Sequence, residues 1–186
     1  MTKTYLLIAL IVLFMTSCNS GKIPKDAKIV APISSTSTPK GSFLLADFSL
    51  EIPAGWEEMA AANTMRVTQF QMQAHPEYEL VISYFGNNAD MVDENIARWR
   101  GQFTKEDSYG ILSLKSSGPT GVKILGTFKT KPFPMAQEFT ESADYGMLAA
   151  ILPSKDGPYF IKLTAPEAII EEAEASFVEL LDSYKR

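Results

Sequence analysis

The 186-residue chain is poor in the side chains that most metal sites and enzyme active sites need. It contains a single cysteine, Cys18, and a single histidine, His75. One cysteine excludes an intramolecular disulfide, and metal sites usually need several converging His, Cys or carboxylate ligands. A Ser-His-Asp triad would depend on His75, and the chain has neither a G-x-S-x-G motif nor a phosphate-binding glycine-rich loop. We therefore predict no metal, no cofactor and no enzymatic activity.

The remaining ionisable side chains do not suggest catalysis either. His75 occurs in the turn signal "AHPE", which predicts a solvated turn residue. The acidic pairs Glu57–Glu58 and Glu171–Glu172 are adjacent in sequence. Because adjacent side chains point in different directions, we interpret both pairs as solvated surface rather than as carboxylates flanking a substrate.

Basic residues are scarce in most of the chain. Residues 43–186 contain 12 Lys plus Arg against 21 Asp plus Glu, which gives a net charge of −9. Nucleic-acid binding requires a basic face, so nucleic acid is not an expected partner. The composition, 46% hydrophobic and 11% aromatic, suits one domain with a single core.

The apolar run near the start of the chain is short. Leu6–Phe14 contains nine apolar residues, whereas a transmembrane helix needs about 20. With Lys3 before it and small residues after it, this run predicts a secretory signal over residues 1–17. The ending "MTSC" resembles a bacterial lipobox, which implies that Cys18 is lipidated and becomes the mature N-terminus. The alternative is a plain signal peptide followed by an incidental cysteine.

The segment after Cys18 has the composition of a tether. Residues 18–42 include the polar stretch "ISSTSTPKGS" and show no apolar period, so we expect a flexible linker to a domain at 43–186. The lysines of this linker either contact anionic lipid or only keep it soluble. Residue 19 is Asn rather than the Asp of inner-membrane retention signals. The lipobox resemblance therefore implies a lipid-anchored protein of the bacterial envelope, on the outer membrane and facing the periplasm.

Hydrophobic periodicity within the domain predicts strands and two helices. Alternation of period two, or a continuous apolar run, occurs in six segments: "FSLEIP", "MRVTQFQM", "YELVISYF", "VKILGTFK", "YGMLAAIL" and "YFIKLT". "YGMLAAIL" is apolar on both faces, which is typical of a central strand covered on both sides. One helix is predicted from Asp90, and a second after "TAPE" with Pro166 at its first position. The expected class is α+β, an antiparallel sheet of about six strands with helices on its faces.

The second predicted helix has a clear inner stripe. The residues that share this face are Ile169, Ala173, Phe177, Leu180 and Tyr184. Lys185 and Arg186 are expected at its C-terminal end, where the helix dipole favours cations.

The most distinctive stretch is "NIARWRGQF", Asn95–Phe103. On a helix, Val92, Ile96, Trp99 and Phe103 lie within one arc and predict the core-facing stripe.

Polar residues flank that stripe on both sides. Asn95, Arg98 and Gln102 lie on one side at spacings that allow mutual hydrogen bonds, and Arg100 lies on the other side near Asp93. These four flanking residues either clamp neighbouring structure or contact a ligand or partner, and the sequence leaves both options open.

Two short motifs resemble a set of uncharacterised bacterial envelope proteins. Asn95, Arg98, Trp99, Gly101 and Gln102 match an N-x-x-RW-x-GQ helix motif. Lys162, Leu163, Thr164 and Pro166 match a KLTGP strand end, where Ala165 stands in place of Gly. The order of elements, with "FSLEIPAGW" near the start, is similar to PsbP-like domains. This resemblance implies an α/β/α sandwich and a non-enzymatic role in binding or assembly.

The sequence therefore supports three hypotheses of unequal standing. The first is a lipid-anchored periplasmic module that binds an envelope protein or supports assembly. The second is a carrier or sensor that grips a small anion with Arg98 and Gln102. The third and weakest is a hydrolase built from carboxylates far apart in the sequence.

Overall fold

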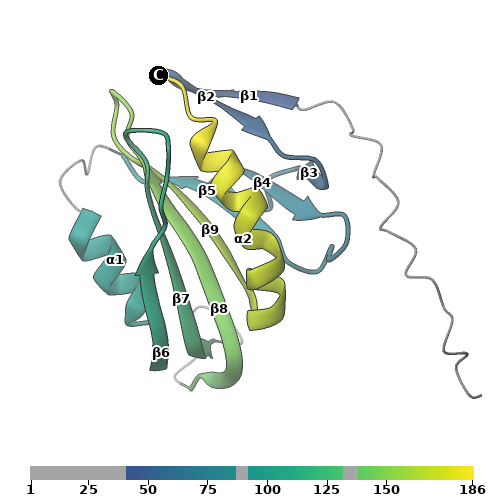
Figure 1. Ribbon diagram of the computed structural model, residues 1–186, viewed down its shortest axis with the longest axis vertical. Coiled ribbons are helices and arrows are strands. Elements are labelled where there is room, and N and C mark those ends of the chain that lie inside the picture. Colours follow the sequence, from purple (N-terminus) through teal and green to yellow (C-terminus); the bar gives the residue numbers. More distant parts are fainter. Residues whose placement is uncertain (1–40, 87–91, 132–137) are drawn as a thin grey trace, which may run out of the picture. The chain divides into compact units, whose positions relative to one another are not determined.

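The structure is a computed structural model that describes residues 41–86, 92–131 and 138–186. The elements are β1 (Gly41–Leu45), β2 (Phe48–Ile52), β3 (Trp56–Met59), β4 (Arg66–Met72), β5 (Glu79–Tyr84), α1 (Val92–Arg100), β6 (Phe103–Ile111), β7 (Thr120–Thr130), β8 (Thr140–Leu152), β9 (Tyr159–Pro166) and α2 (Glu167–Asp182) (Figure 1). The predicted signal peptide, Cys18, residues 19–40 of the predicted tether and Asp90 lie outside the described residues.

The strands form two antiparallel sheets. The larger sheet has seven strands in the order β3-β4-β5-β9-β8-β7-β6, and β1 pairs only with β2. Neighbouring strands pair antiparallel throughout the larger sheet. Strand β9 is therefore the central strand of seven. The predicted α+β class with an antiparallel sheet is confirmed.

Both faces of the larger sheet are covered by other elements, which gives three layers. Helix α2 and the β1–β2 pair pack on one face, where Phe177, Phe48 and Leu163 belong to one buried cluster (Figure 1). Helix α1 packs on the opposite face through Ile96 and Trp99. The predicted α/β/α layering is therefore confirmed.

Strand β8 shows why a continuous apolar run was expected at the centre of the sheet. Its residues alternate between the two clusters, with Leu148 and Ala150 on the α2 face and Met147 and Ala149 on the α1 face. All four are buried. Each face of the strand therefore needs apolar side chains, as the sequence pattern indicated.

Three strands were not predicted. Strand β6 lies at one edge of the larger sheet and its residues from Thr104 to Ser108 are exposed, so it has no apolar alternation to detect. Strand β3 is a short edge strand of four residues. Strand β1 begins at Gly41, so it includes two residues that the sequence interpretation assigned to the tether.

The end of the chain differs from the prediction in detail. Pro166 is the last residue of β9 and the N-cap of α2, not its first helical residue. The stripe prediction is right for Ala173, Phe177 and Leu180, but Ile170 and not Ile169 is fully buried.

The two terminal basic residues lie beyond α2, which ends at Asp182. Lys185 forms an antiparallel bridge with Ser49, and Arg186 pairs with Asp47 at 2.8 Å. Lys185 and Arg186 therefore attach the C-terminus to the β1–β2 pair, and neither lies in the last turn of α2.

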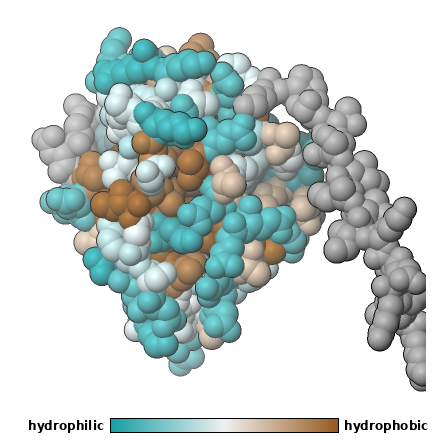
Figure 2. Space-filling view, in the orientation of Figure 1, coloured by the Kyte–Doolittle hydropathy of each residue, from teal (hydrophilic) through white to brown (hydrophobic). Residues whose placement is uncertain are grey.

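Among the described helices, neither α1 nor α2 is long and apolar enough to cross a membrane. Hydrophilic side chains cover much of the face shown in Figure 2, with hydrophobic ones gathered in patches between them.

Candidate functional site

Helix α1 is fixed to the sheet by the apolar stripe that the sequence predicted. Ile96 and Trp99 are buried, and they pack with Phe103 at the start of β6. The cluster around them takes its other buried residues from β7, β8 and β9 and none from β3, β4 or β5. The helix thus covers one half of its sheet face. Its edge lies over β9, and polar side chains meet there.

Asn95 and Arg98 are bonded to each other at this edge. The Arg98 Nη2 group donates a hydrogen bond of 2.6 Å to the Asn95 side-chain oxygen one turn earlier. Asn95 is buried, with 7% of its surface exposed, whereas Arg98 is exposed. The i,i+3 pairing expected from the sequence is therefore present, and it orients the guanidinium group along the helix.

Gln102 connects the helix edge to the central strand. Its side-chain oxygen accepts a long hydrogen bond of 3.5 Å from Lys162 Nζ on β9. Its backbone oxygen accepts a bond of 2.8 Å from the Lys129 amide. The two sequence motifs of the predicted resemblance, around Arg98 and around Lys162, therefore lie side by side.

Lys162 occupies an unusual position for a lysine. It is partly buried on the central strand of the sheet, between Val81 of β5 and Ala149 of β8. Burial lowers the pKa of the Lys162 ammonium, and the positive charges of Arg98 and Arg66 lower it further. Neither Lys162 nor Arg98 forms an ion pair with any carboxylate among the described residues. Two cations thus meet without a counter-charge.

Arg66 is different, because it has its own acidic partner. Its Nη1 group lies 2.6 Å from Glu79 Oε2 and 2.6 Å from the side-chain oxygen of Gln69. Gln69 in turn donates to Glu79 Oε1 at 3.1 Å. This network satisfies the buried Gln69 amide, and both oxygens of the Glu79 carboxylate have partners within it.

Two adjoining cavities follow the sheet face beside α1, and both are lined by Val81 and Lys162. We call them together the α1–β9 groove. The cavity toward the helix has a volume of about 280 Å³ and is also lined by Arg98, Gln102, Phe85 and Phe160. The cavity away from the helix has a volume of about 250 Å³ and is also lined by Arg66, Tyr78, Glu77, Glu79 and Thr164.

The charge of the groove is opposite to that of the domain. Three cations, Arg66, Arg98 and Lys162, meet two carboxylates, Glu77 and Glu79, and both carboxylates line the cavity away from the helix. The cavity beside α1 holds two of the cations and no carboxylate. Residues 43–186 carry 12 basic and 21 acidic side chains, so a net positive cavity stands out on a net negative domain.

Thr164 adds an unsatisfied polar group to the groove. Its Oγ1 atom is buried and has no hydrogen-bond partner, which holds for no other buried side-chain nitrogen or oxygen in the described part of the chain. Thr164 lies two residues after Lys162 on β9, so both side chains project from the same face of the sheet. Buried polar groups in native proteins are normally bonded, so this unpartnered hydroxyl at the wall of the groove is an exception.

The fourth predicted site residue, Arg100, is not brought to the groove. Its guanidinium group forms two bonds with the Glu106 carboxylate, at 2.7 and 2.8 Å. It also lies 4.4 Å from the centre of the Tyr109 ring. The helix spacing placed Arg100 on the same side as Asp93, and its observed partner, Glu106, is on β6, which follows α1 directly in the sequence. Arg100 therefore clamps α1 to the edge strand.

Sequence reasoning named Asn95, Arg98 and Gln102 but did not select Lys162, Thr164 or Arg66 as site residues. Lys162 carried a signal, because it is the only charged residue of a strand whose other side chains are apolar apart from Thr164. Strand order decides whether that lysine lies at an edge or at the centre of the sheet, and the order could not be read from the sequence.

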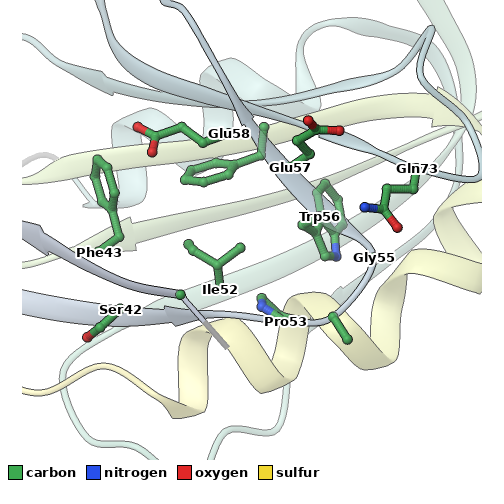
Figure 3. A pocket seen from close by; sticks show the side chains of 12 residues that line it. Ser42, Phe43, Ile52, Pro53, Gly55, Trp56, Glu57, Glu58 and Gln73 are labelled. Atoms are coloured by element: carbon green, nitrogen blue, oxygen red, sulfur yellow. The ribbon is translucent and has the colours of Figure 1, made fainter. Parts of the chain in front are cut away.

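A third cavity, of about 390 Å³, lies between the β1–β2 pair and β3. Phe43, Ile52 and Trp56 line it, and the carboxylates of Glu57 and Glu58 point in opposite directions (Figure 3). Glu58 accepts a hydrogen bond of 3.0 Å from the Thr68 hydroxyl. Both residues line the cavity, but their carboxylates point apart, as expected for adjacent residues of a strand.

The remaining acidic and imidazole groups do not form a cluster. The single histidine lies in its predicted turn, but it is only partly exposed, and its Nε2 atom lies 3.1 Å from Glu172. Within residues 41–86, 92–131 and 138–186, no group of three or more His, Cys, Asp and Glu side chains could hold a metal ion.

Comparison with known proteins gives structural likenesses alone. No protein-family model and no curated protein sequence matches the chain. The chain is similar to the solution structure of cyanobacterial PsbP (CyanoP) from Synechocystis sp. PCC 6803, with 9% identity over 84% of this chain and 98% of that one, and a TM-score of 0.49. It is also similar to a crystal structure from Bacteroides thetaiotaomicron VPI-5482, with 17% identity over 77% of this chain and 47% of that one, and a TM-score of 0.45.

A PsbP structure is thus among the structures similar to this chain, in line with the resemblance noted in the sequence. Both TM-scores lie below 0.5, so these likenesses carry no information about function.

Proposed function

We propose that the protein is a lipid-anchored envelope protein that binds a small anionic ligand in the α1–β9 groove. One observation carries this proposal. Lys162 and Arg98 line the same cavity, and neither has a carboxylate partner among the described residues. Placing uncompensated charge on a partly buried face is costly. An anion that binds between the two cations offsets that cost.

The chemistry of the groove suits binding better than catalysis. The Arg98 guanidinium offers several donors in a plane, and the Lys162 ammonium is a compact positive charge, a combination that recognises carboxylate or phosphate groups. The described residues that line the groove include no histidine or cysteine that could act as base or nucleophile. We therefore assign the groove to a carrier or sensor and not to an enzyme.

The expected cellular location rests on the sequence. The apolar run Leu6–Phe14 followed by Cys18 supports a secreted, lipid-anchored protein, and Asn19 favours the outer membrane. The groove would then face the periplasm at the end of a tether. A Cys18→Ser variant expressed in a bacterial host should leave the membrane fraction and appear in the soluble envelope fraction. Retention of that variant in the membrane fraction would contradict the lipid anchor.

The binding proposal is tested by titration of the full-length protein. Acetate and inorganic phosphate, added at constant ionic strength, should shift the backbone NMR signals of residues 98–102 and 160–164 in a saturable manner. Arg98→Gln and Lys162→Gln should each weaken this binding by roughly tenfold or more, since a hydrogen bond to a charged group contributes about 1.5–3 kcal/mol.

Arg100→Gln is the matched control for these variants. It removes a cation of the same helix whose partner is Glu106, so it should leave the binding unchanged. Equal weakening by all three variants would indicate nonspecific electrostatics, and an absence of saturable shifts would refute the anion site.

The first hypothesis from the sequence, an envelope protein partner, also has an observation in its favour. The edge hairpin β3–β4 exposes three apolar side chains, Met59, Met65 and Val67. Methionine is common at adaptable binding surfaces. Crosslinking in intact cells from position 65 should capture one defined neighbour. Position 85, in the groove, gives the background level of crosslinking. If crosslinking from position 65 does not rise above that level, this second function is excluded.

A further inference from the structure

The α1–β9 groove has an apolar end next to its cations. Phe85 has 49% of its surface exposed, and its ring centre lies 5.8 Å from that of the buried Phe160. Trp99 lies edge-on to Phe160, with the ring centres 6.4 Å apart. These three aromatic residues line the same cavity as Arg98 and Lys162.

The cavity is larger than a simple anion. At about 280 Å³ it is close to the lower limit of small-molecule sites, which is about 300 Å³. Inorganic phosphate or acetate would occupy the space between Lys162 and Arg98 and leave the exposed ring of Phe85 in water, whereas Trp99 and Phe160 are already buried. A ligand that covers Phe85 as well would remove apolar surface from water, which is favourable.

We infer that the ligand is an amphipathic anion, a carboxylate whose aliphatic chain lies along Phe85, Phe160 and Trp99. The inference rests on the proposed function and specifies the ligand class of that site. The carboxylate would lie between Lys162 and Arg98. Val81, which separates the two halves of the groove, would contact the first carbons of the chain.

Chain length is the variable that tests the inference. The full-length protein is titrated with acetate, butanoate, hexanoate and octanoate at one pH and ionic strength, below the concentration at which octanoate forms micelles. Each methylene that becomes buried should tighten binding by about two- to fourfold, given about 0.8 kcal/mol for complete burial. The gain should stop at the length that fills the cavity.

Two variants separate the apolar part of the site from its charged part. Phe85→Ser should flatten the dependence on chain length and leave acetate binding within about twofold. Arg98→Gln should weaken all four acids by a similar factor. Phe139→Ser is the matched control, because Phe139 is exposed to a similar extent, 54%, and does not line the groove. Melting curves establish first that each variant is folded.

The possible outcomes distinguish the inference from the proposed function. A dependence on chain length that Phe85→Ser abolishes and Phe139→Ser preserves supports the inference. Equal binding of acetate and octanoate overturns it and leaves the anion site standing. Tighter binding of octanoate that neither Phe85→Ser nor Arg98→Gln changes places the fatty chain elsewhere and also overturns it. Failure of all four acids and of phosphate to bind refutes both.

Discussion

The Lys162 ammonium lies 3.5 Å from the side-chain oxygen of Gln102, and no carboxylate among the described residues pairs with it. This contact joins the central strand of the sheet to the turn that follows α1. A neutral amide oxygen at this distance compensates poorly for the water that the ammonium loses on burial. The position of Lys162 is therefore a cost to folding that a role in binding would explain.

Removal of the Lys162 charge should therefore stabilise the protein. Lys162→Met keeps most of the aliphatic stem and deletes the ammonium, so we expect the melting temperature to rise by roughly 2–4 °C, equivalent to about 1 kcal/mol. Lys123→Met is the control, because Lys123 is also partly buried but pairs with Glu174 at 2.6 Å. That control should not become more stable.

The difference in stability between Lys162→Met and the wild type should depend on pH. Burial and the charges of Arg98 and Arg66 lower the pKa of Lys162 in the folded state. The destabilisation is therefore complete below the folded pKa and decreases as the pH rises toward the unfolded value of about 10.4. Chemical unfolding at pH 7 and near pH 10 should show a smaller advantage of Lys162→Met at the higher pH. An equal advantage at both values would mean that the ammonium is not the cause.

Trp99 and Arg98 are neighbours that should respond very differently to substitution. Trp99 is buried in the cluster under α1 with 3% of its surface exposed, so Trp99→Ala should cost about 3–5 kcal/mol and lower the melting temperature by roughly 6–20 °C. Arg98 is exposed and bonds to Asn95 on its own helix, so Arg98→Ala should cost about 1 kcal/mol or less. A large loss of stability in Arg98→Ala would make it a structural clamp and remove the motive for the anion site.

Gly126 is a position where the fold requires glycine. Its φ angle is +153°, and a Cβ atom there would overlap the Lys105 carbonyl oxygen of the neighbouring strand β6. Gly126→Ala should therefore cost about 2 kcal/mol or more in unfolding free energy. Gly110 lies on β6, where an added Cβ atom would meet no other part of the chain within 4 Å, so Gly110→Ala should change stability by about 0.5 kcal/mol at most. Similar effects of the two substitutions would contradict this account.

Hydrophobic periodicity in the sequence predicted most of the strands and both helices, and the strands that it missed have a physical reason. The second half of β8, residues 146–152, was found because burial on both faces favours apolar residues at each of its positions. Strand β6 was missed because it is an edge strand with an exposed face, where polar residues are tolerated.

Only part of the candidate site could be predicted from the sequence, because some of its residues are brought together by local geometry and others by strand order. Asn95, Arg98 and Gln102 follow from helix geometry, which is local. Lys162 enters only through strand order, which depends on pairing between strands far apart in the sequence, such as β5 with β9 through Val81 and Lys162.

The ion pair of Arg100 with Glu106 should give α1 a stability that is lost in acid. The hydrogen bonds from Arg100 hold the pKa of the Glu106 carboxyl below its usual value. A lowered pKa contributes stability that is present above the unfolded value of about 4.3 and lost as the pH falls through the folded value. Arg100→Gln should therefore melt slightly lower than the wild type at pH 7, and the difference should shrink as the pH falls below about 4.3 and through the folded pKa of Glu106. A difference that persists at low pH would assign it to the contact with Tyr109 instead.

Thr164 offers a final test, because its buried hydroxyl has no hydrogen-bond partner. Thr164→Val replaces this group by an apolar one of similar shape, so we expect stability to stay the same or to rise by up to about 1 kcal/mol. Thr68 is the matched control. It is buried with 3% of its surface exposed, and its hydroxyl donates to Glu58 at 3.0 Å. Thr68→Val should therefore cost about 1 kcal/mol.

The two threonine variants should also separate folding from binding. Thr164 lines the α1–β9 groove, so a ligand that bonds its hydroxyl loses affinity in Thr164→Val even though the protein is no less stable. Thr68 does not line the groove, so Thr68→Val should bind the anion normally despite its lower stability. Melting curves and anion titrations on the same two variants measure both effects. Lower affinity without lower stability is the result expected for a residue that is retained for binding. If Thr164→Val loses stability and keeps full affinity, its hydroxyl serves the fold and the ligand does not extend to that end of the groove.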